Sequence, residues 1–194
     1  LNVQPGPVVV DAQFRIGVLQ GVLRQLTLVA DPRLRWLPVP RQESLADVRI
    51  RRGDVQTLQL DLARPAEDRL TLRTRFLLTD TSGIGNLRLP RLEVRGARFT
   101  TRWLAASIDQ SLEYETAAAA EETESEVPAF MNAWGPNATI PDLACQLPSG
   151  RLDWSLTTRL RQPKTTGSQL LAHYIDARST VVHFIADLST ADGY

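Results

Sequence analysis

Apolar and polar residues alternate along much of this chain, and this alternation limits what the chain can fold into. In residues 69–78, Leu70, Leu72 and Phe76 fall on one side of an extended backbone, whereas Arg73 and Arg75 fall on the other. A repeat of two residues is the spacing of a β-strand that buries one face. The same pattern recurs in residues 47–52, 55–62, 86–89, 91–95 and 152–158.

Turn sequences separate these runs at intervals of about 10 to 15 residues. They include Gln20-Gly21, Arg52-Gly53-Asp54 and Arg95-Gly96. No helical period lies between the strands of the first 115 residues, and parallel sheets need crossover helices. We therefore predict an all-β fold, an antiparallel β-sandwich with a long acidic loop or linker and further strands after it.

The alternation stops in residues 116–143, which divides the chain into three parts. Residues 1–115 are predicted to form a β-sandwich domain. Residues 116–143 contain alanine, glutamate and proline without alternation, and we expect a linker or long loop there. A second interpretation is a short exposed helix over Ala117–Glu126, because alanine and glutamate favour helices. A third is that this acidic segment docks on the arginine-rich sheet of residues 1–115. Residues 144–194 contain further strands, which either complete the sandwich or begin a second β module.

The last strand-like segment has a pattern similar to that of the first. Aligning residues 8–21 with residues 180–193 pairs Val10 with Val182, and Ile16 with Leu188. The residues at the inward positions have a similar total volume, although few positions are identical. Two unrelated amphipathic strands explain this likeness, or residues from Thr180 onward begin a further β module of a tandem array.

Charge and composition exclude several classes of partner. The charges of the 22 basic and 22 acidic residues cancel. Residues 1–115 contain 17 arginines and 13 acidic residues, and the remainder contains five basic and nine acidic residues. This small excess of about +4 is too weak to predict a nucleic-acid surface. No apolar run is long enough to insert into a membrane. Cys145 is the single cysteine, so an intrachain disulfide is impossible and a thiolate zinc site is not expected.

Residues with catalytic side chains do not form a recognisable constellation. His173 and His183 are ten residues apart without a metal-binding motif, and Ser82 in Asp80–Gly83 fits a turn better than a nucleophile. Glu113 and Glu115 share one face of a strand at about 6 to 7 Å by strand rise, a spacing compatible with the carboxylate pair of a glycosidase. Surface carboxylates two residues apart are common, however. We predict no catalytic residue, no metal site and no cofactor.

Tryptophan is the residue type that best marks a binding surface in this sequence. Trp36 and Trp154 share a face with leucines, so we predict that both belong to the core. Trp134, in an otherwise polar segment, and Trp103 are the predicted ligand contacts, because indole rings stack on the apolar faces of sugars. The alternative for Trp134 is an anchor that pins its loop.

Together these patterns predict a non-catalytic β-sandwich module with a structural or binding role in a larger protein. The expected partners are neighbouring domains of the same protein or another protein, and the expected location is extracytoplasmic, in a bacterium. The alternative function is a carbohydrate-binding or accessory domain of a polysaccharide-active enzyme. This assignment is a class-level analogy, because one fold hosts many functions.

Overall fold

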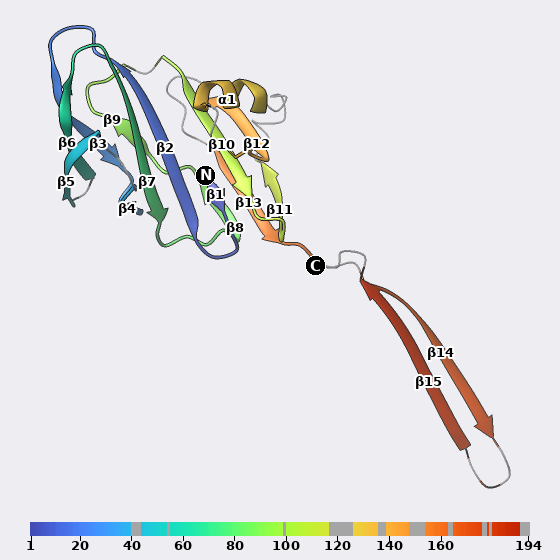
Figure 1. Ribbon diagram of the computed structural model, residues 1–194. Coiled ribbons are helices and arrows are strands. Elements are labelled where there is room, and N and C mark those ends of the chain that lie inside the picture. The colour runs from blue at the N-terminus through green and yellow to red at the C-terminus, as the bar shows by residue number, and fades with distance from the viewer. Residues whose placement is uncertain are drawn as a thin grey trace. The chain divides into compact units, whose positions relative to one another are not determined.

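The computed structural model describes residues 1–39, 44–53, 55–98, 100–116, 126–135, 139–147, 154–162, 165–175, 178 and 180–190. The chain divides into two compact units (Figure 1). Unit 1 comprises residues Leu1–Leu160, and unit 2 comprises residues Arg161–Tyr194. We describe each unit by itself.

Unit 1 consists of strands and one short helix among its described residues. Its helix α1 (Val127–Trp134) lies between β11 and β12 in the sequence. The strands are β1 (Asn2–Val3), β2 (Val8–Gly17), β3 (Leu23–Ala30), β4 (Leu34–Leu37), β5 (Leu45–Arg51), β6 (Gln56–Ala66), β7 (Arg69–Leu78), β8 (Gly85–Arg88), β9 (Leu92–Val94), β10 (Arg102–Ile108), β11 (Leu112–Thr116), β12 (Leu143–Leu147) and β13 (Ser155–Leu160).

These strands form three sheets, and all their pairings but one are antiparallel. The six-stranded sheet has the order β12-β10-β1-β2-β7-β4, the four-stranded sheet β5-β6-β3-β9, and the three-stranded sheet β11-β13-β8. The exception is β1, which pairs in parallel with β10. The predicted all-β, antiparallel sandwich-like fold is confirmed.

The alternation seen in the sequence coincides with burial in the structure. On β7 the side chains of Leu72, Thr74, Phe76 and Leu78 are buried, whereas Arg73 is exposed. One continuous core cluster contains residues from all three sheets, so the sheets share a single hydrophobic interior. The cluster includes Val8 and Phe76 from the six-stranded sheet, Leu28 and Leu60 from the four-stranded sheet, and Leu87 and Leu156 from the three-stranded sheet.

Part of the C-terminal third completes the sheets of unit 1. Strand β12 pairs with β10, and β13 pairs with β11 and β8. Unit 2 contains the hairpin of β14 (Thr165–Ile175) and β15 (Thr180–Thr190), which pair with each other in antiparallel register. Among the described residues, these two strands have no other strand partner.

Helix α1 lies inside the segment for which the sequence analysis expected a linker or loop. Its apolar residues Val127, Phe130 and Trp134 are three and four positions apart, which is helical spacing. Pro128 stands in the first turn, where the missing N–H costs little. The helix contacts β10 and β12 (Figure 1). Residues 117–125, which carried the alternative helix prediction, lie outside the described residues.

The connection between β7 and β8 passes close to the backbone near β1. The Gly83 N–H donates to the Gly6 carbonyl oxygen at 3.1 Å. A Cβ atom on Gly83 would lie 1.8 Å from the carbonyl oxygen of Gln4, so only glycine fits here. The Ser82 hydroxyl donates to the Pro5 carbonyl oxygen at 2.9 Å and accepts from the Ile84 N–H at 3.2 Å. Ser82 is therefore a turn residue, as predicted.

Replacing Gly83 should test this close approach. We expect Gly83→Ala to lower the free energy of unfolding by about 1–3 kcal/mol, because the new methyl group forces the two backbone segments apart. Gly17→Ala is the matched control, since a Cβ atom at Gly17 meets nothing within 4 Å. Urea denaturation of the two variants measures the difference. Equal stabilities would show that the two segments do not touch.

Candidate functional site

The two predicted ligand contacts, Trp103 and Trp134, lie on either side of the same phenylalanine. Phe130 on α1 meets Trp103 of β10 with ring centroids 6.4 Å apart and planes inclined by 62°. It meets Trp134, one helical turn further on, at 5.5 Å and 31°. Phe130 is buried and both tryptophans are half-buried. We call these three residues the aromatic cluster.

Hydrogen bonds hold the start of α1 against the edge strand β12. The Glu126 N–H donates to the Ala144 carbonyl oxygen at 3.2 Å. The Glu126 carboxylate accepts from the Gln146 N–H at 2.7 Å, which satisfies one backbone donor of an edge strand. These bonds fix the helix so that Phe130 faces Trp103.

Side chains from β2 hold the other end of the helix. The Arg15 guanidinium donates to the Trp134 carbonyl oxygen at 3.3 Å. In the amide orientation that satisfies both of its groups, Gln13 donates to the same carbonyl at 3.2 Å and accepts from Arg15 Nε at 3.2 Å. Gly135 ends the helix with φ +112°, a conformation that favours glycine. Trp134 is thus the last residue of a helix tied down at both ends.

The geometry of the aromatic cluster is that of a helix-to-sheet contact. Edge-to-face and tilted rings at these distances stabilise each other beyond the area they bury. Because the three rings are mutually inclined, they do not present one flat platform. Trp103 and Trp134 each keep part of the indole accessible, so a role of either residue in ligand contact remains a prediction.

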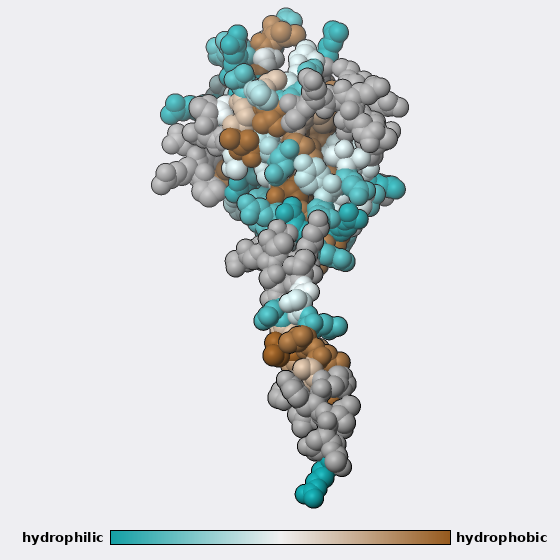
Figure 2. Space-filling model, turned by 90° about the vertical axis from the view of Figure 1, so that its right-hand side faces the viewer, coloured by the Kyte–Doolittle hydropathy of each residue, from teal (hydrophilic) through white to brown (hydrophobic). Residues whose placement is uncertain are grey.

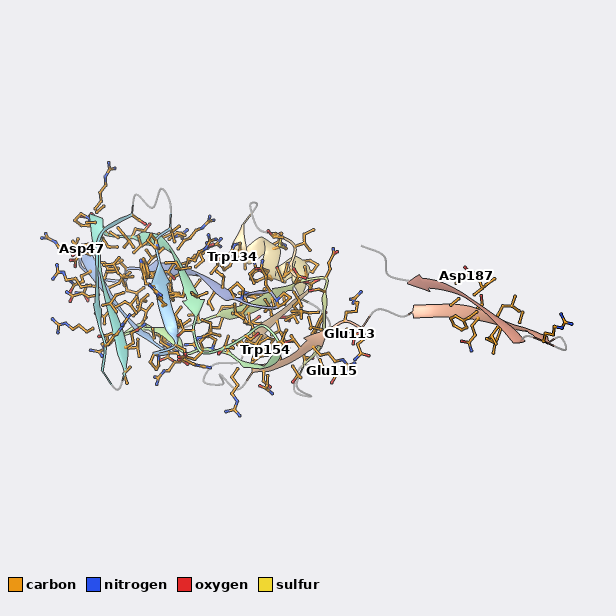
Figure 3. All side chains as sticks on the ribbon, turned by 90° about the horizontal axis from the view of Figure 1, so that it is seen from below. Asp47, Glu113, Glu115, Trp134, Trp154 and Asp187 are labelled. Atoms are coloured by element: carbon orange, nitrogen blue, oxygen red, sulfur yellow. The ribbon has the colours of Figure 1, made fainter. Side chains whose placement is uncertain are left out.

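Glu113 and Glu115 lie beside each other on β11 (Figure 3). Across the strand pair, Arg159 Nε lies 2.9 Å from a Glu113 carboxylate oxygen, and the guanidinium lies 3.7 Å from a Glu115 oxygen. One arginine therefore lies close to both carboxylates and compensates one of their two negative charges. This arrangement is an exposed cross-strand ion pair of the kind that stabilises a sheet surface.

A polar groove of about 560 Å³ lies at the end of β7 and β8. It is lined by segments that are not adjacent in the sequence. Asp80, one of its residues, adopts a positive φ of +56°. Its lining residues are Arg33, Asp80, Thr81, Ser82, Ile84, Asn86 and Arg88. No local sequence signal could have found this groove, because Arg33 and Asn86 are brought together only by the tertiary fold.

Arg33, on one wall of the groove, is already engaged by Asp31. Its Nε donates to one Asp31 oxygen at 3.0 Å and its terminal nitrogen to the other at 2.7 Å. This bidentate hydrogen bond lowers the pKa of the Asp31 carboxyl below its usual value. The same contact raises the pKa of Arg33, to which the nearby Asp80 charge adds. The positive charge of Arg33 is therefore largely compensated by Asp31, with Asp80 nearby.

The remaining chemical candidates do not assemble into a site in the described part of the chain. No group of three or more His, Cys, Asp or Glu residues there could hold a metal ion. His173 and His183 lie on β14 and β15, and their side chains are outside the described set. Burial raises the pKa of the Cys145 thiol, and the Glu126 carboxylate raises it further, which favours the protonated thiol.

Comparisons with known proteins do not add an assignment. No protein-family model, curated protein or solved structure matches the chain. Within the described residues, no helix has the length and apolar character needed to span a membrane.

Removing the central ring of the aromatic cluster should release the helix. We expect Phe130→Ala to lower the free energy of unfolding by about 3 kcal/mol, because a buried ring is lost. It should also shift tryptophan emission to longer wavelength, since Trp103 and Trp134 lose their common contact. Tyr114→Ala, at an exposed aromatic residue, is the control and should change stability by less than about 0.5 kcal/mol. An unchanged emission maximum in Phe130→Ala would contradict the described cluster.

The Asp31–Arg33 ion pair should contribute to stability only while the carboxylate is charged. The pKa of Asp31 is lower in the folded state, so the contribution is full above the unfolded value of about 3.9 and disappears as pH falls through the folded value. We expect Asp31→Asn to cost up to about 1 kcal/mol at pH 7 and progressively less below about pH 4. A double-mutant cycle with Arg33→Gln gives the coupling energy of this pair. It is measured by urea denaturation at pH 7 and again below about pH 4. A coupling energy independent of pH would contradict this assignment.

Proposed function

We propose that this chain is a non-catalytic β-sandwich module of a larger extracytoplasmic protein, and that it has a structural and binding role. Its partners would be neighbouring domains of the same protein or another protein. The observation that carries the proposal is the solvent-exposed apolar surface of the β14–β15 hairpin, which a binding partner would bury.

Large apolar side chains of the hairpin are exposed to solvent. Their exposed fractions range from 52 to 63%. Figure 2 shows brown, hydrophobic atoms on the surface of unit 2. The residues are Leu170, Leu171, Val182, Phe184 and Ile185. A two-stranded hairpin is marginally stable in water by itself, and clustered exposed apolar residues mark interaction surfaces. The hairpin is therefore suited to bind protein.

The groups that would support catalysis are used for structure instead. Glu113 and Glu115 share Arg159, and Arg33 is held by Asp31. No polar side-chain atom that is buried in the described part of the chain lacks a hydrogen-bond partner. Unsatisfied or poised polar groups are typical of active sites, so their absence among these residues supports a structural role.

Carbohydrate binding is the alternative function, and the aromatic cluster supports it less well. A sugar face stacks on an accessible planar ring, whereas the central ring of the cluster is buried. Titration calorimetry with soluble polysaccharides tests this alternative. Binding that is lost in Trp134→Ala would favour it over the structural role.

Polar substitutions in the hairpin should remove its apolar surface without unfolding unit 1. We expect Leu171→Ser combined with Phe184→Ser to reduce the binding of an apolar fluorescent dye by at least about twofold, because a clustered patch is lost. Leu19→Ser is the matched control, since Leu19 is a fully exposed leucine of unit 1 outside any patch. Dye binding that falls equally in both variants would contradict the hairpin as binding surface. Glycoside hydrolysis that Glu113→Gln abolishes would contradict a non-catalytic role.

A further inference from the structure

The strand β8 lies at one edge of the three-stranded sheet of unit 1 and borders the polar groove. It pairs with β13 on one side, and no described strand pairs with it on the other. The side chains of Asn86 and Arg88 line the groove, whereas Leu87 between them is buried in the core. Side chains alternate along a strand, so the groove lies on the outward face of β8.

The register between β8 and β13 shows which backbone groups of β8 face its free edge. Just beyond β8, the Leu89 N–H donates to the Trp154 carbonyl oxygen at 3.0 Å, and the four residues of β8 continue the same antiparallel register. Hydrogen-bonded and non-hydrogen-bonded pairs alternate along such a ladder. Leu87 therefore bonds to β13, as Leu89 does. The N–H and C=O groups of Asn86 and Arg88 point the other way, toward the free edge.

The outward groups of β8 have no partner in the part of the chain that the structure describes. No described residue forms a hydrogen bond with the outward N–H or C=O groups of Asn86 and Arg88, and their side chains have no described hydrogen bond or ion pair. Both residues are exposed. Unpaired backbone groups on an edge strand are a template for the addition of a further strand.

The groove beside β8 has the size and position to accept such a strand. The rest of its lining includes Arg33, which precedes β4, and Asp80, which follows β7, so a second sheet contributes to it. Its volume of about 560 Å³ lies within the range of about 300–1,000 Å³ that is usual for binding clefts. An edge with free backbone groups and an adjoining groove for side chains is the arrangement that recognises extended peptides.

The charges of the groove indicate which peptide fits. Asp31 holds Arg33 in an ion pair, and the charge of Asp80 acts on the same guanidinium. Arg88 is thus the groove cation that lacks a described counter-ion. A strand bonded to Asn86 and Arg88 places the side chains of its directly paired residues on the groove face. A carboxylate in that position would form charge-assisted hydrogen bonds with the Arg88 guanidinium.

We propose that β8 is a docking site for an extended, acidic segment of a partner protein, which joins the three-stranded sheet as a fourth strand and sets a carboxylate against Arg88. Backbone hydrogen bonds to Asn86 and Arg88 supply affinity, and the Arg88 guanidinium supplies selectivity. The β8 edge of a second copy would bring a second Arg88, and like charges on paired strands repel. The site lies in unit 1, so it goes beyond the proposed hairpin surface and does not depend on it.

Selection from a displayed library of random dodecapeptides tests this site on the whole 194-residue chain. Asn86→Pro serves for counter-selection, because it removes an N–H that faces the free edge and leaves the bonds to β13 in place. We expect peptides that bind the unaltered chain and not Asn86→Pro, with Asp or Glu at alternate positions. Asn86→Ala keeps the N–H and should bind these peptides within about twofold of the unaltered chain.

Fluorescence polarisation with the selected peptides separates the two parts of the proposal. We expect Arg88→Glu to weaken binding at least about tenfold, because a charge-assisted contact becomes a repulsive one. Arg69→Glu, at an exposed arginine of β7, is the matched control and should change binding by less than about twofold. N-methylation of alternate peptide amides removes backbone donors and leaves the side chains intact, so it should also abolish binding. Urea denaturation verifies that each variant is folded.

Four outcomes would overturn the inference. They are a selection that yields no peptide dependent on the Asn86 N–H, selected peptides without an acidic preference, N-methylated peptides that bind equally well, and a dimer in sedimentation that Asn86→Pro dissociates. The last outcome would assign the edge to a second copy. Leu171→Ser combined with Phe184→Ser should leave peptide binding unchanged. Loss of peptide binding in that variant would place the peptide on the hairpin, which contradicts the β8 site and leaves the proposed function standing.

Discussion

Burial of one apolar face per strand is the constraint on which this structure depends. Side chains alternate across a strand, so a sheet with leucines on one side and arginines on the other must pack its leucines against a second sheet. Unit 1 satisfies this requirement with a core shared by three sheets, in which Leu72 and Phe76 are fully buried.

Several outward arginines of unit 1 form ion pairs with acidic residues nearby. Arg75 lies 2.6 Å from Asp11 on the neighbouring strand, and Arg159 bridges Glu113 and Glu115. Each exposed pair adds little to stability. The β14–β15 hairpin differs from these polar surfaces, because several of its large apolar side chains are exposed to solvent.

The sequence was sufficient for features that depend on neighbouring residues and insufficient for those that depend on distant ones. Alternation predicted the strands and the core positions of Trp36 and Trp154, because burial on a strand repeats every two residues. Helix α1 was missed because three apolar residues at helical spacing stand in a proline-containing, acidic segment. The contact of Phe130 with Trp103, and the polar groove at Arg33, arise from tertiary packing that no local pattern encodes.

The first hairpin of unit 1 depends on strands that come later in the chain. In unit 1, Val10 pairs with Phe76 of β7 and belongs to the core cluster that the three sheets share. Strand β1 pairs with β10, so that Asn2 and Ser107 pair across more than a hundred residues. Contacts of this sequence separation are costly in chain entropy, and they stabilise the hairpin only after the later strands are in place.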